Sequence, residues 1–123
     1  MIPQVTAAAL VSENKSLAFP ASVDSIPTSA GQEDHVSMAP IAALKAAKIA
    51  QNAAGGIGIE LIAAAQGVDC HAPLETSYKL QVVHARVRAL SPFLASDRYW
   101  AAEIAALQEA VLAGVMAPPL VLS

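Results

Sequence analysis

The sequence predicts an all-α protein, a fragment of a helical bundle with about four to five helices and a long ordered loop near residues 16–31. Alanine is abundant and aromatic residues make up only 4% of the chain, which favours closely packed helices over sheets. Hydrophobic residues make up 55% and charged residues 14%, against a usual charged fraction of about 25%. Part of the surface is therefore expected to lie against other protein.

The first segment, from Val5 to Lys15, is rich in alanine and is predicted to be the end of a helix. No capping residue precedes it, so we expect the chain to be a fragment of something longer. Prolines and small polar residues over 16–31 then predict a loop. Its apolar residues Pro20, Val23 and Ile26 are expected to anchor it as an ordered loop.

A second helix is predicted from about Gln32 to Gly67, with a kink or a break at Pro40. Three clustered glycines within it each cost about 1 kcal/mol relative to alanine, which indicates a close helix crossing; these are Gly55, Gly56 and Gly58. A phosphate-binding loop is the alternative, but the spacing Gly-Gly-Ile-Gly after a helix does not fit known phosphate loops.

A third helix is predicted from Thr76 or Ser77 to about Leu90, with one apolar stripe formed by Leu80, Val83, Val87 and Leu90. His84 lies beside this stripe and is expected to be packed or half-exposed. A fourth helix is predicted from Asp97 to a stop at Gly114. The apolar tail Pro118–Leu122 is expected to be extended and to pack on another surface.

The composition argues against several classes of partner. A net charge of −3 with scattered basic residues argues against nucleic acid. The single cysteine, Cys70, excludes an internal disulfide and fits a reducing cytoplasm, and Cys70 with His71 lacks the further ligands of a zinc site. The start of the chain shows no signal peptide, and the longest apolar stretch, 53–65, is shorter than the ~20 residues that span a bilayer. We expect a cytoplasmic protein without metal or membrane contact.

Two places hold candidate functional acids. Glu60 lies in an apolar segment, where a structural salt bridge to a neighbouring helix is expected more than a functional role. The polar stretch from Asp24 to Met38 gathers acid, amide, imidazole and hydroxyl groups. Its residues Gln32 to His35 are predicted at a helix N-terminus, which favours anions. Either Thr28, Ser29 and Asp34 only cap the helix and the acids are only solvated, or this stretch forms a site.

A resemblance favours the second interpretation. The run Pro20–Ala30 (PASVDSIPTSA), followed by Gln32–Met38 (QEDHVSM), resembles the C-terminal signature of histidine ammonia-lyases. Weaker similarity lies in Ser12–Lys15, Ile59–Leu61, Ala65–Gly67 and Asp97–Tyr99. The resemblance covers nearly the whole chain. It implies that residues 1–123 are a single helical region, the C-terminal part of a larger ammonia-lyase chain that converts histidine to urocanate and ammonia in histidine catabolism.

The resemblance implies that Glu33 is the active-site acid that binds the substrate imidazole, with Gln32 beside it as a second substrate-binding residue. A carboxylate can accept the imidazole N–H and stabilise its charged form. Relatives that act on phenylalanine or tyrosine carry amide side chains in this region. The sequence departs from the usual pattern at Phe19, where a histidine is common, and at Gly31, where an asparagine is common.

The family's electrophile is a methylidene-imidazolone formed from an internal Ala-Ser-Gly tripeptide, and this sequence has none. Ser29-Ala30-Gly31 holds the same residues in another order and is no substitute. We therefore expect no cofactor in this chain and no lyase activity from it alone. The implied partners are the rest of a lyase chain, the other subunits of a homotetramer, and L-histidine. The alternatives are a stand-alone helical oligomerisation or structural module derived from the lyase, or part of a phenylalanine or tyrosine ammonia-lyase.

Overall fold

The computed structural model describes residues 1–117 and confirms the all-α prediction, with four α-helices. These are α1 (Ile2–Leu17), α2 (Ala39–Asp69), α3 (Tyr78–Leu90) and α4 (Ala101–Leu112), with one short 3-10 turn, η1 (Ser29–Gly31). No strand occurs within the described range. The predicted packing of Pro118–Leu122 falls outside the described residues.

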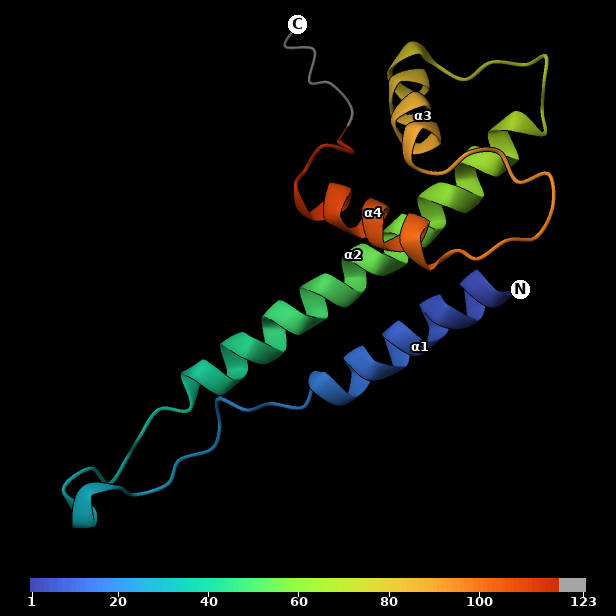
Figure 1. Cartoon of the computed structure of the whole chain (residues 1–123). Coiled ribbons are helices and arrows are strands. Elements are labelled where there is room, and N and C mark those ends of the chain that lie inside the picture. The colour runs from blue at the N-terminus through green and yellow to red at the C-terminus, as the bar shows by residue number, and fades with distance from the viewer. Residues whose placement is uncertain (118–123) are drawn as a thin grey trace, which may run out of the picture.

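The long helix α2 is the axis of the fold. Figure 1 shows α1 running antiparallel along its flank, α4 crossing it, and α3 lying near its C-terminal end. The closest helix pairs are α2 with α4 and α2 with α1. Within residues 1–117 no helix, not even the long α2, has an apolar stretch that could cross a membrane.

The predicted start of the second helix was wrong. The helix begins at Ala39 and not at Gln32, so Pro40 stands in its first turn and produces neither a kink nor a break. A proline is tolerated there because the first N–H groups of a helix have no intrahelical acceptor, and its fixed φ suits the first turn. The ordered loop therefore extends to Met38 and is longer than predicted, although α1 continues to Leu17 and delays the start of the loop.

The predicted start of the fourth helix was also wrong, since α4 begins at Ala101 with Trp100 as its N-cap. Arg98 accounts for the delay. Its guanidinium donates to the backbone carbonyls of Pro92 (2.6 Å) and Phe93 (3.2 Å), which closes residues 92–98 into a loop. The predicted stop is confirmed, because Gly114 has a φ of +72° just after the helix end.

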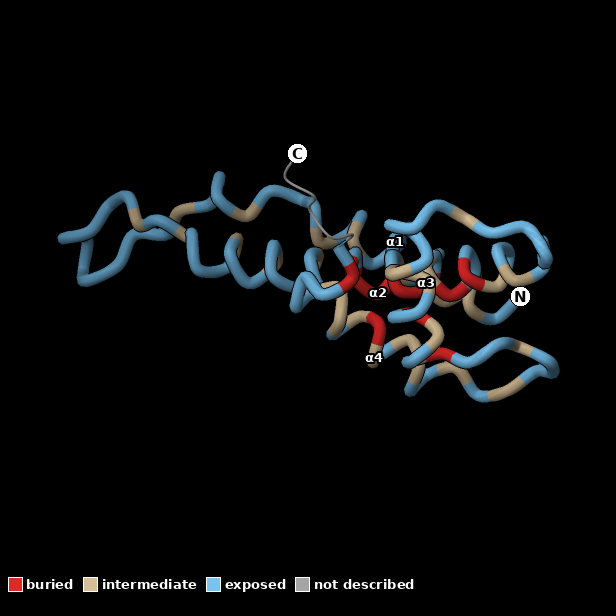
Figure 2. The backbone as a smooth tube through the Cα atoms, turned by 90° about the horizontal axis from the view of Figure 1, so that it is seen from above, coloured by how far each residue is buried: buried red, intermediate tan, exposed pale blue. Residues whose placement is uncertain are grey.

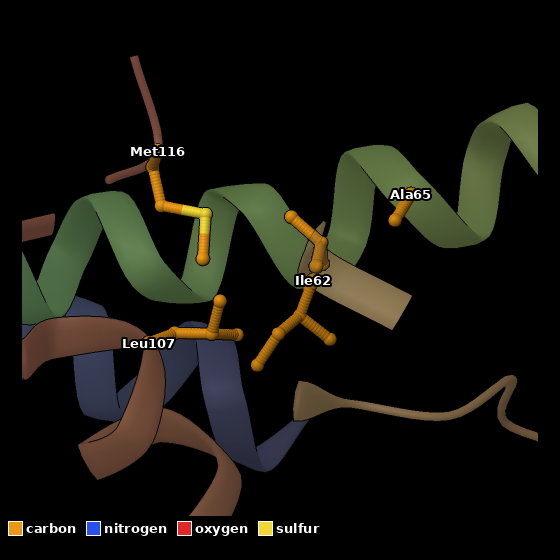
Figure 3. Packing of buried hydrophobic residues seen from close by; sticks show 5 residues of the cluster. Ile62, Ala65, Leu107 and Met116 are labelled. Carbon is orange, nitrogen blue, oxygen red and sulfur yellow. The ribbon is translucent and has the colours of Figure 1, made fainter. Parts of the chain in front are cut away.

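The hydrophobic core lies where α2, α3 and α4 meet. Figure 3 shows Ile62 and Ala65 of α2 facing Leu107 of α4, with Met116 beside them. Val87 of α3 completes the buried cluster. Of the predicted stripe on α3, Val87 is buried but Leu80 is 54% exposed. The first turn of α3 therefore carries an apolar side chain that this core leaves uncovered.

Two of the three clustered glycines allow close helix crossings, as predicted. A Cβ on Gly55 would lie 3.1 Å from Leu10 Cδ1 of α1, and a Cβ on Gly58 would lie 3.2 Å from Leu107 Cβ of α4. A Cβ on Gly56 would meet nothing within 4 Å. The glycine cluster therefore lets α2 approach both neighbouring helices within one turn.

Residues 18–51 project from this core, and we call them the arm. The arm consists of the loop 18–38 and the first turns of α2, and none of its residues is buried. Figure 2 shows it as an exposed extension, with the buried positions confined to the other part of the molecule. Several large apolar side chains on it are more than half exposed: Phe19, Val23, Ile26, Ile41 and Leu44.

Candidate functional site

The tip of the arm is a tight loop with an unusual backbone. Ser29, Ala30 and Gly31 have φ values of +52°, +54° and +84°. Non-glycine residues in this left-handed region cost roughly 1–2 kcal/mol each, and such strain tends to collect at functional sites. Gly31 suits its position, and asparagine also adopts this conformation more readily than other side chains. Glycine at position 31, where the family commonly has asparagine, is therefore compatible with this left-handed turn.

Glu33 follows this turn and is held by its backbone. Thr28 N–H donates to the Glu33 carbonyl (2.8 Å), and Glu33 N–H donates to the Thr28 carbonyl (3.3 Å). The Thr28 hydroxyl donates to Glu33 Oε2 at 3.4 Å, which is a weak bond. The carboxylate is exposed and forms no ion pair with any residue of 1–117. The backbone is thus fixed while the carboxylate stays available.

The neighbours of Glu33 are equally accessible. Gln32, Asp34 and His35 are exposed, and Gln32 lies beside Glu33 as the sequence requires. Because α2 begins at Ala39, these residues do not stand at an α-helix N-terminus. The predicted stabilisation of Glu33 or Asp34 by a helix dipole is therefore wrong, and the same correction removes their helix-capping role. The turn at 29–31 orients this segment instead.

A second polar cluster joins the end of α3 to α4. Arg98 donates to both carboxylate oxygens of Glu103, with Nε to Oε1 at 2.6 Å and Nη2 to Oε2 at 3.0 Å. The fully buried Ser91 also donates its hydroxyl to Glu103. The hydrogen bond from Arg98 lowers the pKa of Glu103, with smaller help from Ser91 and the charge of Arg88, and it raises the pKa of Arg98. The cluster fixes the loop between the two helices.

Arg88 ties α3 to the end of α2. Its Nε donates to Asp69 Oδ2 at 2.8 Å, and its other nitrogens donate to the Ser91 carbonyl and to Gln66. His84 Nε2 lies 2.8 Å from the other oxygen of Asp69, a close contact without the alignment of a hydrogen bond. His84 is half-buried, as predicted. These groups pair with one another within the fold, which indicates a structural role.

The remaining predicted candidates stay apart. Glu60 is exposed and belongs to none of the ion pairs within 1–117, so the predicted structural salt bridge does not form within the described residues. Cys70 is exposed and its thiol is free, and His71 Nδ1 lies 2.7 Å from the Gly67 carbonyl. No group of three or more metal-ligating side chains occurs among the described residues.

A groove of about 910 Å³ lies between α1, α2 and the loop 94–100. Its lining is mainly apolar and includes Ala7, Leu10, Gly56, Ile59 and Ala63, with Glu60 among its few charged residues. Glu33 lines neither this groove nor the two smaller pockets, which lie around the end of α2. A binding site that uses Glu33 would therefore need walls from outside these residues.

Sequence reasoning missed the most buried polar side chain of the helix pair α1 and α2. Asn52 is 3% exposed, and its amide donates to Glu13 Oε2 (2.7 Å) and Asn14 Oδ1 (2.9 Å). The available signal was the amide pair Gln51-Asn52 beside an alanine and glycine stretch, since a buried polar group needs partners. The sequence also gave no hint that Arg98 and Glu103, five residues apart across a loop, form an ion pair.

Comparison with proteins of known sequence places this chain among longer enzymes. The histidine ammonia-lyase of Aromatoleum aromaticum is 56% identical over 117 residues, which cover 95% of this chain and 22% of that protein. The histidine ammonia-lyase of Desulfotalea psychrophila is 58% identical over 114 residues, with 93% and 22% covered. The chain therefore spans about a fifth of the length of these curated relatives.

Solved structures and a family profile agree with these relatives. The histidine ammonia-lyase from Trypanosoma cruzi matches 94% of this chain and 23% of its own, with a TM-score of 0.88 and 46% identity. The tyrosine aminomutase from Streptomyces globisporus matches 92% and 22%, with a TM-score of 0.83 and 34% identity. The profile of the family described as aromatic amino acid lyase matches residues 1–89. This chain therefore belongs to the aromatic amino acid lyase family.

Proposed function

We propose that this chain is the C-terminal segment of a histidine ammonia-lyase and that it supplies Glu33, the acid that binds the substrate imidazole. Gln32 acts beside it as a second substrate-binding residue. The remainder of the enzyme supplies the electrophilic group and the other walls of the site. The observation that carries this proposal is the presentation of Glu33, because its backbone is fixed in a strained turn while its carboxylate has no cationic partner among residues 1–117.

The position of Glu33 at the tip of an exposed arm supports a shared site. The arm has no buried residue and carries large exposed apolar side chains, among them Phe19 and Val23. Exposed apolar side chains gathered on one segment favour contact with other protein. A carboxylate on such an arm can enter a site whose other residues come from elsewhere in the enzyme. We extend the proposal to a homotetramer that works in histidine catabolism in the cytoplasm.

Glu33 has a defined chemical task in this proposal. Its ionised carboxylate accepts an N–H from the imidazole ring of L-histidine. A hydrogen bond to a charged group contributes roughly 1.5–3 kcal/mol, and every 1.4 kcal/mol corresponds to about a tenfold change in affinity. Because the imidazole nitrogens distinguish histidine from phenylalanine and tyrosine, this contact would select histidine.

The residues of this chain do not fit the family's methylidene-imidazolone. The sequence has no Ala-Ser-Gly tripeptide, and Ser29-Ala30-Gly31 holds the same residues in another order and forms the left-handed turn at the arm tip. We therefore derive no step through this group, and we assign its formation to the remainder of the enzyme. The isolated chain is expected to be inactive.

Complementation tests the proposal. The chain is mixed with a truncated histidine ammonia-lyase of Desulfotalea psychrophila that lacks the matching segment, and urocanate formation from L-histidine is followed by absorbance. Each polypeptide alone is expected to be inactive and the mixture active. Glu33→Gln is expected to reduce kcat/KM for histidine by about 10- to 100-fold, through the loss of a charged hydrogen-bond acceptor.

Asp34→Asn is the matched control, because Asp34 is an equally exposed acid one residue further along. It is expected to leave kcat/KM within about twofold of the unmodified mixture. Equal effects of the two substitutions would contradict the assigned role of Glu33. Activity of the isolated chain above its Glu33→Ala variant would contradict the assignment of the electrophile to the remainder of the enzyme.

The likeness to a tyrosine aminomutase supports a second candidate substrate class, an aromatic amino acid such as tyrosine or phenylalanine. The same mixture assayed with these amino acids separates the two, because preference for tyrosine over histidine would favour the second candidate. A stand-alone oligomerisation module is the remaining alternative. It predicts self-association in sedimentation experiments and no restored activity in the mixture.

A further inference from the structure

The contact between α1 and α2 contains one buried polar side chain among small and apolar ones. Asn52 is 3% exposed, while Ala54 and Gly55 beside it are also buried. Gly55 lies so close to Leu10 that an added Cβ would stand 3.1 Å from the Leu10 Cδ1. Small residues allow this close approach. They offer little that would distinguish one axial alignment of the helices from another.

The hydrogen bonds of Asn52 distinguish one axial alignment of α1 and α2 from another. Its side-chain amide donates to Glu13 Oε2 at 2.7 Å and to Asn14 Oδ1 at 2.9 Å, on two successive residues of α1. A slip of α1 by one helical turn, about 5.4 Å, would separate the amide from both acceptors. A buried amide without partners is costly, and single buried polar residues are known to fix register between packed helices.

The register of this pair determines where the arm tip stands. The loop 18–38 joins the end of α1 to the start of α2, so an axial slip moves one end of the loop relative to the other. A contact at the base of the arm depends on the same alignment, because Lys45 Nζ of α2 donates to the Phe19 carbonyl just after α1. The tip that carries Glu33 has no contact with the core, so it depends on these connections for its position.

We propose that Asn52 is a positioning residue, which sets the register of α1 on α2 through Glu13 and Asn14 and thereby fixes where the arm presents Glu33. The consequence for catalysis rests on the proposed function of Glu33. The assignment of the helix register to Asn52 does not rest on that function. The register can therefore be measured in the isolated chain without any lyase assay.

Distance measurements between two nitroxide labels test the register. Labels are placed at V5C on α1 and L44C on α2, both exposed positions, in a C70S background that removes the free thiol. These positions lie well apart along the helix pair, so an axial slip changes their separation. The chain with Asn52 is expected to show one distance population. Asn52→Leu is expected to add a second population displaced by about 5 Å, one helical turn.

Glu13→Gln is the matched control, because its side-chain oxygen still accepts from Asn52, and it is expected to keep a single population. The double variant Glu13→Leu, Asn14→Leu removes both acceptors and is expected to resemble Asn52→Leu. It serves as the test if Asn52→Leu loses its helical circular dichroism. A single unchanged population in the folded variants would overturn the proposal. Loss of helix in both would also overturn it, because these residues would then maintain the fold without selecting a register.

The complemented enzyme gives the functional readout. At saturating partner, Asn52→Leu is expected to raise KM for histidine by the reciprocal of the fraction of molecules that keep the original register, about twofold if the two populations are equal, since Glu33 would be misplaced in the others. Label distances that shift without any effect on KM would remove the link to Glu33 and leave the register assignment intact. Complete absence of activity with Asn52 present would contradict the proposed function alone.

Discussion

Three glycines of α2 lie within one helical turn and meet different surroundings. Gly58 faces the backbone of α4, where an added Cβ would lie 3.2 Å from Leu107 Cβ and 3.4 Å from Gln108 N. Gly55 faces the end of a side chain, Leu10 Cδ1, which can move. Gly56 faces open space. The same residue type therefore has different physical roles at neighbouring positions.

Alanine substitutions are expected to separate these roles. Gly58→Ala should lower the free energy of unfolding by about 1 kcal/mol, because overpacking costs about 1–3 kcal/mol and exceeds the gain in helix propensity of about 1 kcal/mol. Gly56→Ala should raise it by about 0.5–1 kcal/mol, since only the propensity gain applies. Urea unfolding followed by circular dichroism measures both. A more stable Gly58→Ala chain would contradict the close contact with α4.

At the scale of the element, Glu103 connects α4 to the loop that precedes it. Its pKa is lowered, chiefly by the hydrogen bond from Arg98. The folded state therefore binds a proton to Glu103 less readily than the unfolded state does. The resulting stabilisation is complete above the ordinary pKa of a glutamate, about 4.3, and is lost as pH falls through the lower folded pKa.

Glu103→Gln is expected to lower Tm at pH 7 and to weaken the fall of Tm between about pH 5 and pH 3, because the titrating carboxylate is gone. Glu109→Gln is the control, since Glu109 lies on the same helix and is exposed. It should leave the pH profile of Tm unchanged. Thermal melts across this pH range make the comparison, and parallel profiles for Glu103→Gln and the unmodified chain would refute the assignment.

The elements show how far a sequence determines this fold. The helices, the close crossing at Gly55 and Gly58, and the stop at Gly114 follow from local rules of periodicity, packing and backbone conformation. The two wrong helix starts have non-local or ambiguous causes. Pro40 can interrupt a helix or begin one, and the sequence pattern does not decide between them. The start of α4 depends on Arg98, whose bonds to the carbonyls of Pro92 and Phe93 form only in the folded loop.

The candidate site likewise has some features that follow from local sequence and others that do not. Its location between Asp24 and Met38 stays a prediction, which rests on the polar side chains that gather there. The left-handed turn at Ser29 and Ala30 was not predictable, since neither residue type prefers a positive φ. The role of Glu33 in substrate binding stays a prediction from family resemblance. Asn52 was missed because the acceptors that satisfy it lie on another helix, 38 and 39 residues away.

At the scale of the whole molecule, composition predicted that this chain would have too few polar side chains to cover its surface. The structure agrees, since large apolar side chains such as Phe19, Val23 and Leu44 are more than 70% exposed. What composition could not predict is their distribution over the arm and beside a groove of about 910 Å³. The relatives are several times longer and retain 56–58% identity over this region. We therefore expect a helical segment from the rest of the enzyme to occupy the groove.

Two glycines of α2 allow this expectation to be tested. Gly56 and Gly67 both have open space where a Cβ would lie, but only Gly56 lines the groove. Leucine at either position should leave the isolated chain folded, because a Cβ at either position meets no neighbour within 4 Å. Only Gly56→Leu should obstruct a helix that enters the groove. It should raise the concentration of truncated lyase needed for half-maximal activity by at least tenfold.

Titration of each variant with the truncated lyase measures this difference. The two substitutions are matched in residue type and helix, so a general loss of helix quality would affect both half-maximal concentrations alike. Selective weakening by Gly56→Leu would assign the groove to assembly. If both variants assemble as well as the unmodified chain, the groove would remain open in the complex. The exposed apolar arm would then be the principal contact with the remainder of the enzyme.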